Sequence, residues 1–193
     1  VGVMGPAWSD GQERGLYRTL DGGRTWDRVL WQNPRSGIAD LVMDPSNPDK
    51  LFAAMWEFRR EPWFLTSGGQ GSGLFVTYNG GDSWEQLSSA HGLPEGQLGR
   101  IGLAIAQSNP NVVYSLVEAE RSALIRSEDG GRTWATISDT PGINPRPFYY
   151  ADIRVDPKNE NRIYRLHGSI DVSQDQGRNW ETVVPSQIIH GDI

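Results

Sequence analysis

The side chains that could perform chemistry in this 193-residue chain are carboxylates and arginines in segments typical of surface loops. Hydrolysis of a glycosidic bond generally takes two carboxyl groups that face each other, one acting as an acid and the other as a nucleophile or base. The candidate carboxylates are Glu57, Glu61, Glu95, Glu118 and Asp152, and the candidate arginines are Arg59, Arg60, Arg100 and Arg146. The sequence pairs no two of these carboxylates, so the catalytic residues are unknown at this stage.

Aromatic residues in the same segments indicate binding by stacking. Trp, Tyr and Arg stand among Gly and Pro in the segments 5–14, 57–72 and 139–150, a composition suited to stacking on sugar rings or clamping a peptide. The candidate ligand-binding residues are Trp8, Trp56, Arg59, Arg60, Trp63, Arg146, Tyr149 and His167. Alternatively, such rings pack the loops onto the strands, which suits Phe148 and Tyr150. The expected ligand is a glycan or a polypeptide.

No metal or cofactor site is expected. The chain has no cysteine, and His91, His167 and His190 are not at metal-ligand spacing from one another or from clustered carboxylates. The glycine-rich run 68–73 is followed by neither a helix nor a lysine, so it does not fit a phosphate-binding loop. We expect it to be a flexible loop that could act as a lid.

A turn of eight residues occurs four times. Each copy has a hydroxyl residue first, Asp or Asn third, glycine in the middle and Trp last. The three positions are occupied by Thr19, Asp21 and Trp26, by Thr77, Asn79 and Trp84, by Ser127, Asp129 and Trp134, and by Ser173, Asp175 and Trp180. The Asp or Asn can accept turn amides, glycine supplies positive φ, and Trp can cover the base of a hairpin. We therefore expect all twelve residues to be structural.

The repeated turn resembles the Asp-box, or BNR, repeat of sialidases, oligoxyloglucan-type glycosidases, sortilin-like receptors and photosystem II assembly factors. Proline-containing turns at 44–48, 108–110 and 156–159 strengthen the resemblance, since such turns are common in bacterial Asp-box proteins of the sortilin-like type. The resemblance implies an all-β fold, a β-propeller of four-stranded antiparallel blades. It implies little about activity, because one fold hosts many functions. The Phe-Arg-Ile-Pro signature of sialidases is missing, and residues 58–62 only echo it.

The two turn types predict where the strands lie. From the inside of each blade outward, strands are expected at 38–43, 51–56, 73–77 and 83–87, then at 101–106, 112–117, 123–127 and 133–137, and then at 151–155, 162–167, 170–173 and 179–183. The chain is one domain, 1–193, with a partial blade at 1–30, full blades at about 38–89, 100–138 and 151–184, and a tail at 185–193. Both turn types lie on one rim, so the variable loops and the binding residues are expected on the opposite rim.

Four repeated turns without a complete first blade leave the closure of the ring open. A strand from the tail could complete the first blade, a second chain could complete the ring, or the chain could be part of a longer propeller. We expect the last arrangement for the natural protein. In isolation, we expect the chain to form a homo-oligomer that completes the ring.

The amino-acid composition argues against two classes of partner, nucleic acids and membranes. The net charge of −6 argues against nucleic acid as the main partner, and no run of apolar residues is long enough to insert into a membrane. No signal peptide is visible, and a secreted or periplasmic bacterial location is expected.

Three functions remain open from the sequence. The first is a binding or scaffold module that recognises glycan or polypeptide through the rim opposite the repeated turns. The second is a part of a glycoside hydrolase, similar to a sialidase or a xyloglucanase, whose site is completed by other blades or a second chain. The third is a structural assembly factor, which would present a flat apolar contact instead of a pocket.

Overall fold

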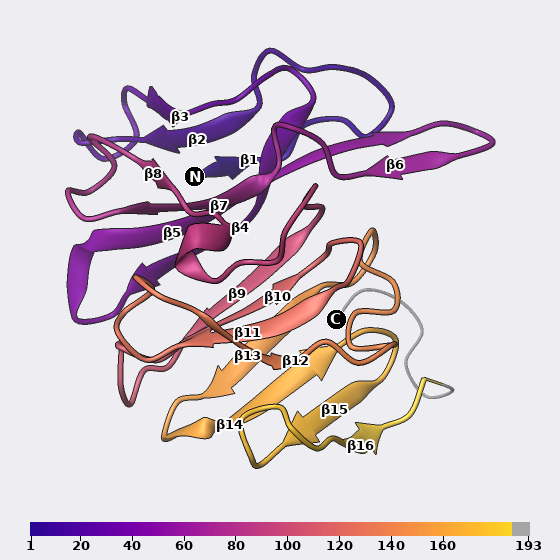
Figure 1. The fold of residues 1–193 in the computed structure, drawn as a ribbon. Helices are drawn as coiled ribbons and strands as arrows, with labels where there is room; N and C mark the ends of the chain where they lie inside the picture. The colour runs from indigo at the N-terminus through magenta and orange to yellow at the C-terminus, as the bar shows by residue number, and fades with distance from the viewer. Residues whose placement is uncertain (187–193) are drawn as a thin grey trace.

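The computed structural model describes residues 1–186 as an all-β chain of consecutive antiparallel sheets (Figure 1). The strands are β1 (Gly2–Val3), β2 (Gly15–Arg18), β3 (Asp27–Leu30), β4 (Ser36–Asp44), β5 (Asn47–Arg60), β6 (Leu65–Ser67), β7 (Gly73–Thr77), β8 (Glu85–Gln86), β9 (Ile101–Ile105), β10 (Val113–Val117), β11 (Ala123–Ser127), β12 (Ala135–Ser138), β13 (Asp152–Asp156), β14 (Asn159–Leu166), β15 (Ile170–Ser173) and β16 (Glu181–Val184). A short 3-10 helix, η1 (Ser89–His91), follows β8. Within the described part, no helix is long and apolar enough to cross a membrane.

The sheets are blades of a β-propeller. Their strand orders are β1-β2-β3, β4-β5-β7-β8, β9-β10-β11-β12 and β13-β14-β15-β16, so each strand pairs with its neighbour in an antiparallel meander. The first strands of the full blades meet along a common axis, because β4 contacts β9 and β9 contacts β13. Three full blades and a partial first blade are therefore present, as expected from the sequence.

The core lies between successive blades. Between the second and third blades, Phe52 and Leu74 pack with Leu103 and Ile125, and all four side chains are buried. A second cluster joins the third and fourth blades and includes Tyr114, whose hydroxyl donates to the Glu160 carbonyl at 2.8 Å. Inner strands are covered on both faces, which explains their long apolar runs without clear alternation.

The repeated turns form compact hydrogen-bonded units that connect the last two strands of each blade, such as β2 to β3 and β11 to β12. In the first turn, one oxygen of Asp21 accepts from the backbone amides of Arg24 and Thr25, both at 2.9 Å. The Thr25 amide, followed by the hydroxyls of Thr25 and Thr19, lowers the pKa of Asp21 to about 2. The amide of Gly23 donates to the Thr19 hydroxyl at 2.8 Å.

The Trp at the end of each turn behaves differently from copy to copy. The indole N–H groups of Trp26 and Trp134 donate to the carbonyls of Gly23 and Gly131, as their place in the turn suggests. The indole nitrogens of Trp84 and Trp180 are buried without a hydrogen-bond partner among the described residues. Packing against the neighbouring blade, and not a shared hydrogen bond, is therefore common to the buried copies.

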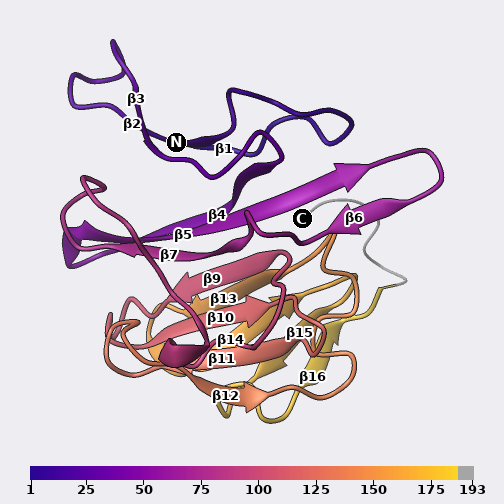
Figure 2. The ribbon, with the colours of Figure 1, turned by 45° about the horizontal axis from the view of Figure 1, so that its top comes forward.

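The segment 57–72 differs most from expectation. It was expected to be a loop, but β5 continues to Arg60 and pairs with β6, and the Glu61 amide closes the turn on the Phe64 carbonyl at 2.8 Å. The glycine-rich run, expected to be flexible, is anchored by Glu57, whose carbonyl accepts from Gly68 and whose carboxylate accepts from Gly71. The resulting β5–β6 hairpin projects from the body of the propeller (Figure 2).

The proposal that the C-terminal tail completes the first blade concerns residues 187–193, which lie outside the described residues.

Candidate functional site

The rim opposite the repeated turns gathers the segments 4–14, 57–72, 118–122 and 139–151, and we call it the loop rim. The β5–β6 hairpin forms its most prominent wall (Figures 1 and 2). Hydrogen bonds tie this wall to the first blade, since the Arg60 amide donates to the Ala7 carbonyl at 2.8 Å. Side chains from three sequence-distant segments thereby come together.

Their meeting point is Tyr149. We use the name Tyr149 cluster for Trp8, Arg60, Arg100, Arg146 and Tyr149. The guanidinium carbon of Arg60 lies 5.7 Å from the Tyr149 ring centroid and 6.0 Å from that of Trp8, and Arg60 hydrogen-bonds the Tyr149 hydroxyl. Arg146 lies 5.3 Å from the same tyrosine ring. Arg100 donates to the Tyr149 carbonyl at 3.1 Å, so guanidinium groups approach this residue from three segments.

A buried aromatic layer supports the cluster. Trp56 stacks on Phe58 with ring centroids 4.2 Å apart, and Phe148 packs edge-on against Trp56 at 5.1 Å. Trp56 is only 2% exposed, and its indole N–H donates to the Ser67 hydroxyl at 2.9 Å. The expectation that Trp56 contacts ligand therefore does not fit this structure, in which Trp56 packs the hairpin onto the blade.

Two further predicted residues of the same segments lie beside the cluster. Arg59 is paired with the Asp10 carboxylate and donates to the Trp8 carbonyl at 2.9 Å, so it fixes the 4–14 loop against the hairpin. Trp63 is at the hairpin tip, 79% exposed, with its ring centroid 6.3 Å from that of Phe64. Trp8, Arg60, Trp63, Arg146 and Tyr149 thus remain accessible or partly accessible on the loop rim.

Two of the candidate carboxylates are engaged in structural bonds. Glu57 is buried, accepts from Gly71 and from the Asn33 side chain at 3.2 Å, and lies 3.5 Å from the Arg35 guanidinium. Glu118 accepts from the Arg100 amide at 2.7 Å and from the Ser67 hydroxyl at 2.5 Å. Both carboxylates therefore join loops of the rim. Among residues 1–186, no group of acidic and His side chains is arranged to hold a metal ion.

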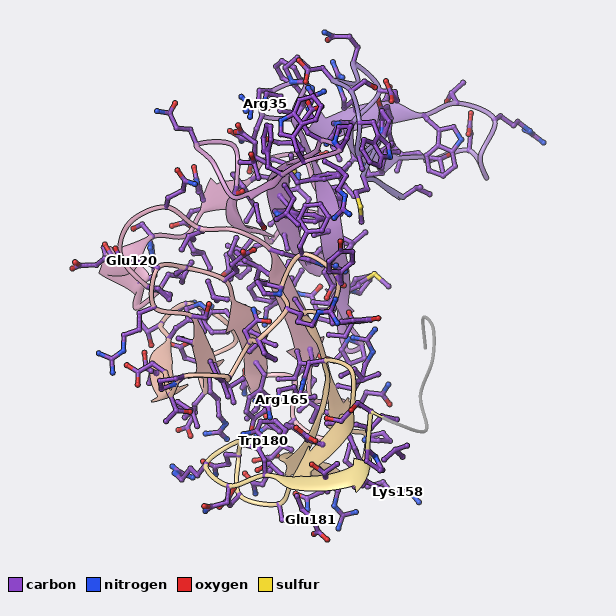
Figure 3. All side chains as sticks on the ribbon, turned by 90° about the vertical axis from the view of Figure 1, so that its right-hand side faces the viewer. Arg35, Glu120, Lys158, Arg165, Trp180 and Glu181 are labelled. Carbon is purple, nitrogen blue, oxygen red and sulfur yellow. The ribbon has the colours of Figure 1, made fainter. Side chains whose placement is uncertain are left out.

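His167 belongs to a separate network in the fourth blade. Its ring nitrogen lies 2.6 Å from the Asp171 carboxylate, which also accepts from Arg165 at 2.7 Å. Burial alone would raise the pKa of Asp171, but the hydrogen bonds, first those from Arg165 and His167, lower it to about 2. Arg165 in turn lies 4.6 Å above the Trp180 ring, and the two side chains are adjacent in Figure 3. His167 is therefore engaged by Asp171, and Arg165 joins this network to the 139–151 segment by donating to the Ile143 carbonyl at 3.0 Å.

This network was missed in the sequence although a signal was present. Arg165 and Asp171 flank the short connection between β14 and β15 and are directly paired across the two strands. Hairpin register could have placed the opposite charges together.

A hollow of about 340 Å³ lies at the propeller axis and is lined by residues that include Asp40, Leu103 and Arg154. Burial raises the pKa of Asp40, and the charge of Asp152 adds to the effect. Both carboxylate oxygens of Asp40 nevertheless accept backbone amides, from Leu41 and from Leu103, each at 2.8 Å. Asp40 thus links the inner strands of two blades.

Comparison with known proteins points to the same fold. No family model matches the chain. It is 29% identical, over 160 residues, to an oligoxyloglucan-reducing end-specific xyloglucanase of Emericella nidulans, and 25% identical to a probable enzyme of that name from Neosartorya fischeri. Each alignment covers 81% of this chain but only 19% and 18% of the relatives, so the chain spans about a fifth of their length.

Solved structures agree on the architecture. The GH74 xyloglucanase of Xanthomonas campestris superposes with a TM-score of 0.67 and 18% identity, covering 91% of this chain and 27% of that one. The GH74 enzyme of Niastella koreensis superposes with a TM-score of 0.67 and 19% identity, covering 92% of this chain and 28% of that one. YCF48 bound to D1 peptide gives a TM-score of 0.51 with 17% identity over 77% of this chain and 40% of that one. At these identities the likeness shows the β-propeller fold alone.

Proposed function

We propose that this chain is a glycan-binding portion of a β-propeller of the Asp-box type and that the loop rim is its binding surface. The observation that carries the proposal is the Tyr149 cluster, where accessible Trp and Tyr rings stand beside arginine donors on a hydrogen-bonded frame. Amphipathic rings held by a rigid layer offer stacking area at little entropic cost. The sequence likeness to xyloglucanases favours a glycan over a polypeptide.

We further propose that the whole protein is a glycoside hydrolase acting outside the cytoplasm and that this chain supplies part of the substrate-binding surface. Support comes from the same relatives and from the state of Glu57 and Glu118, whose carboxylates are committed to structural bonds. Hydrolysis requires two carboxyl groups that face each other, and residues from outside this chain would supply at least one of them, with Glu61, Glu95 and Asp152 the candidates within it.

The binding proposal is tested by calorimetric titration of the 193-residue chain with xyloglucan oligosaccharides. Tyr149→Ala is expected to weaken binding about tenfold, the usual effect of removing a central aromatic anchor. Tyr78→Ala is the matched control, because both tyrosines are 44% exposed and Tyr78 lies in a repeated turn on the opposite rim. Equal loss in the two variants, or no binding by the parent chain, would refute the proposal.

The hydrolase proposal has a separate test. The chain alone, mixed with the same oligosaccharides, is expected to bind without releasing product. Detectable release, abolished by Glu61→Gln, Glu95→Gln or Asp152→Asn but not by Glu181→Gln, a change at an exposed position, would show that a complete catalytic pair lies within this chain.

A further inference from the structure

The Tyr149 cluster carries more positive charge than its own surroundings neutralise. Among the described residues, ion pairs join Arg59 to Asp10 and Arg35 to Glu57, whereas no ion pair involves Arg60, Arg100 or Arg146. Those three guanidinium groups converge on a single tyrosine from β5, from the start of β9 and from the 139–151 loop. The carboxylate of Glu118, which directly follows β10, accepts from the Arg100 backbone amide instead of from the Arg100 guanidinium.

Several guanidinium N–H donors of the Tyr149 cluster are not used in hydrogen bonds among the described residues. A guanidinium group has five N–H donors. Among residues 1–186, the Arg60 side chain makes one hydrogen bond, to the Tyr149 hydroxyl. The exposed Arg146 side chain makes none there and lies over the Tyr149 and Tyr150 rings. The unused donors of two guanidinium groups beside the Tyr149 ring can therefore receive a planar anionic group, through charge-assisted bonds that are about twice as strong as neutral ones.

The excess of positive charge is confined to the Tyr149 cluster. The chain as a whole has a net charge of −6, so polyanions are repelled from most of its surface. A ligand that gains from the cluster must bring its negative charge to this point while presenting an otherwise uncharged body to Trp8 and Tyr149. A sugar ring bearing one carboxylate meets both conditions.

We infer that the Tyr149 cluster selects glycans that contain a uronic acid residue, with the carboxylate held between Arg60 and Arg146 and the sugar ring against Trp8 or Tyr149. Arg100, stacked 5.3 Å from the Trp56 ring and bonded to the Phe148 and Tyr149 carbonyls, positions the tyrosine and adds to the field. This inference rests on the proposed glycan-binding function and specifies its ligand class.

The test compares three ligands of equal length: a neutral oligosaccharide that carries one glucuronic acid residue, the methyl ester of that oligosaccharide, and a neutral xyloglucan oligosaccharide. Titration of the whole chain in low salt is expected to give at least tenfold tighter binding of the free acid than of its methyl ester. Raising the salt concentration is expected to reduce this difference, because an exposed ion pair is screened. Arg146→Gln is expected to abolish most of the difference between acid and ester, because it removes a cation that pairs with the carboxylate, and to weaken binding of the neutral ligand less than binding of the acid.

Arg24→Gln is the matched control, because Arg24 is also exposed but lies in the first repeated turn. Tyr149→Phe is a second variant, which keeps the ring and removes the hydroxyl that holds Arg60. Equal affinity for acid and ester, or an equal effect of Arg24→Gln and Arg146→Gln, overturns the inference while glycan binding stands. Failure of all three ligands to bind overturns the proposed function together with the inference.

Discussion

At the residue scale, single carboxylates determine how the turns and the fourth blade hold together. In the third turn, Asp129 accepts from the Ser127 hydroxyl at 2.7 Å and from the amides of Arg132 and Thr133. Asn79 occupies the same position in the second turn and makes comparable bonds, to the Thr77 hydroxyl and to the Ser83 amide. Acceptor geometry, more than charge, is therefore what the third position requires.

This difference between geometry and charge predicts the ranking of two variants. Asp129→Ala removes the acceptor of the Ser127 hydroxyl and of the Arg132 and Thr133 amides, and it is expected to lower the free energy of unfolding by about 2 kcal/mol, since it leaves several donors unpaired. Asp129→Asn is expected to cost under about 1 kcal/mol, as Asn79 shows that an amide can fill the position. Chemical denaturation measures both values. Equal losses would mean that charge is the main contribution.

Acid stability provides a second prediction at this scale. Hydrogen bonds lower the pKa of Asp21 and of Asp175 to about 2, led in each case by a backbone amide, from Thr25 and from Asn179. A lowered pKa in the folded state contributes stability above the ordinary value of 3.8, and this contribution is lost as pH falls toward 2. The double variant Asp21→Asn, Asp175→Asn is expected to lose less stability between pH 5 and about pH 2 than the parent chain. Parallel pH profiles from thermal melting would contradict this assignment.

At the element scale, the repeated turns also fasten each blade to the preceding one. A Cβ on Gly131, where φ is +89°, would lie 2.2 Å from the Phe52 ring of the second blade, whereas a Cβ on Gly22, at φ +75°, would have no atom within 4 Å. Both positions require positive φ, but only Gly131 is also part of the contact between blades.

These two glycines separate backbone strain from packing. Gly22→Ala is expected to cost about 1 kcal/mol, the strain of a left-handed residue. Gly131→Ala is expected to cost roughly 3 kcal/mol, because the overlap with Phe52 is added to the same strain. Thermal unfolding of the two variants checks the difference. A similar loss in both would show that Phe52 moves aside without cost.

The β5–β6 hairpin shows what the sequence could and could not predict about an element. The apolar run up to Trp56 and the turn residues near 68–73 were recognised, but the pairing of Phe58 with Ser67 and of Arg60 with Leu65 was not. Its strands carry Arg and Glu among the aromatic residues, a pattern also typical of a surface loop. The 4–14 loop supports the hairpin through hydrogen bonds from the Arg59 side chain and the Arg60 amide. These bonds join residues about fifty positions apart, which the sequence pattern does not reveal.

At the scale of the whole molecule, the first blade is open where the others are covered. Trp134 packs edge-on against Phe52 of the preceding blade and is 7% exposed, while Trp26, at the same place in the first turn, is 45% exposed. No preceding blade is present among residues 1–186 to cover Trp26. We propose that another blade covers this face, from a second copy of the chain when the chain is isolated.

Light scattering on the isolated chain is expected to give a mass above that of one chain at micromolar concentration. Trp26→Lys is expected to shift the mass toward the monomer, because it places a charge in the proposed contact. Trp63→Lys, an equally drastic change at the exposed hairpin tip, is expected to leave the mass unchanged. A monomeric parent chain would exclude completion of the ring by a second copy.

The sequence alone determined the blades, because the turn residues act locally: a hydroxyl, an Asx side chain and a glycine at fixed spacing satisfy one another within eight residues. It also supplied Trp8, Arg60, Arg146 and Tyr149 as candidates. Only the tertiary structure decided which candidates meet, since that depends on the hairpin and on how blades stack. In the tertiary structure Trp56 is buried, Arg59 pairs with Asp10, and His167 is bonded to Asp171. Contacts between distant segments convert a set of residue types into a site.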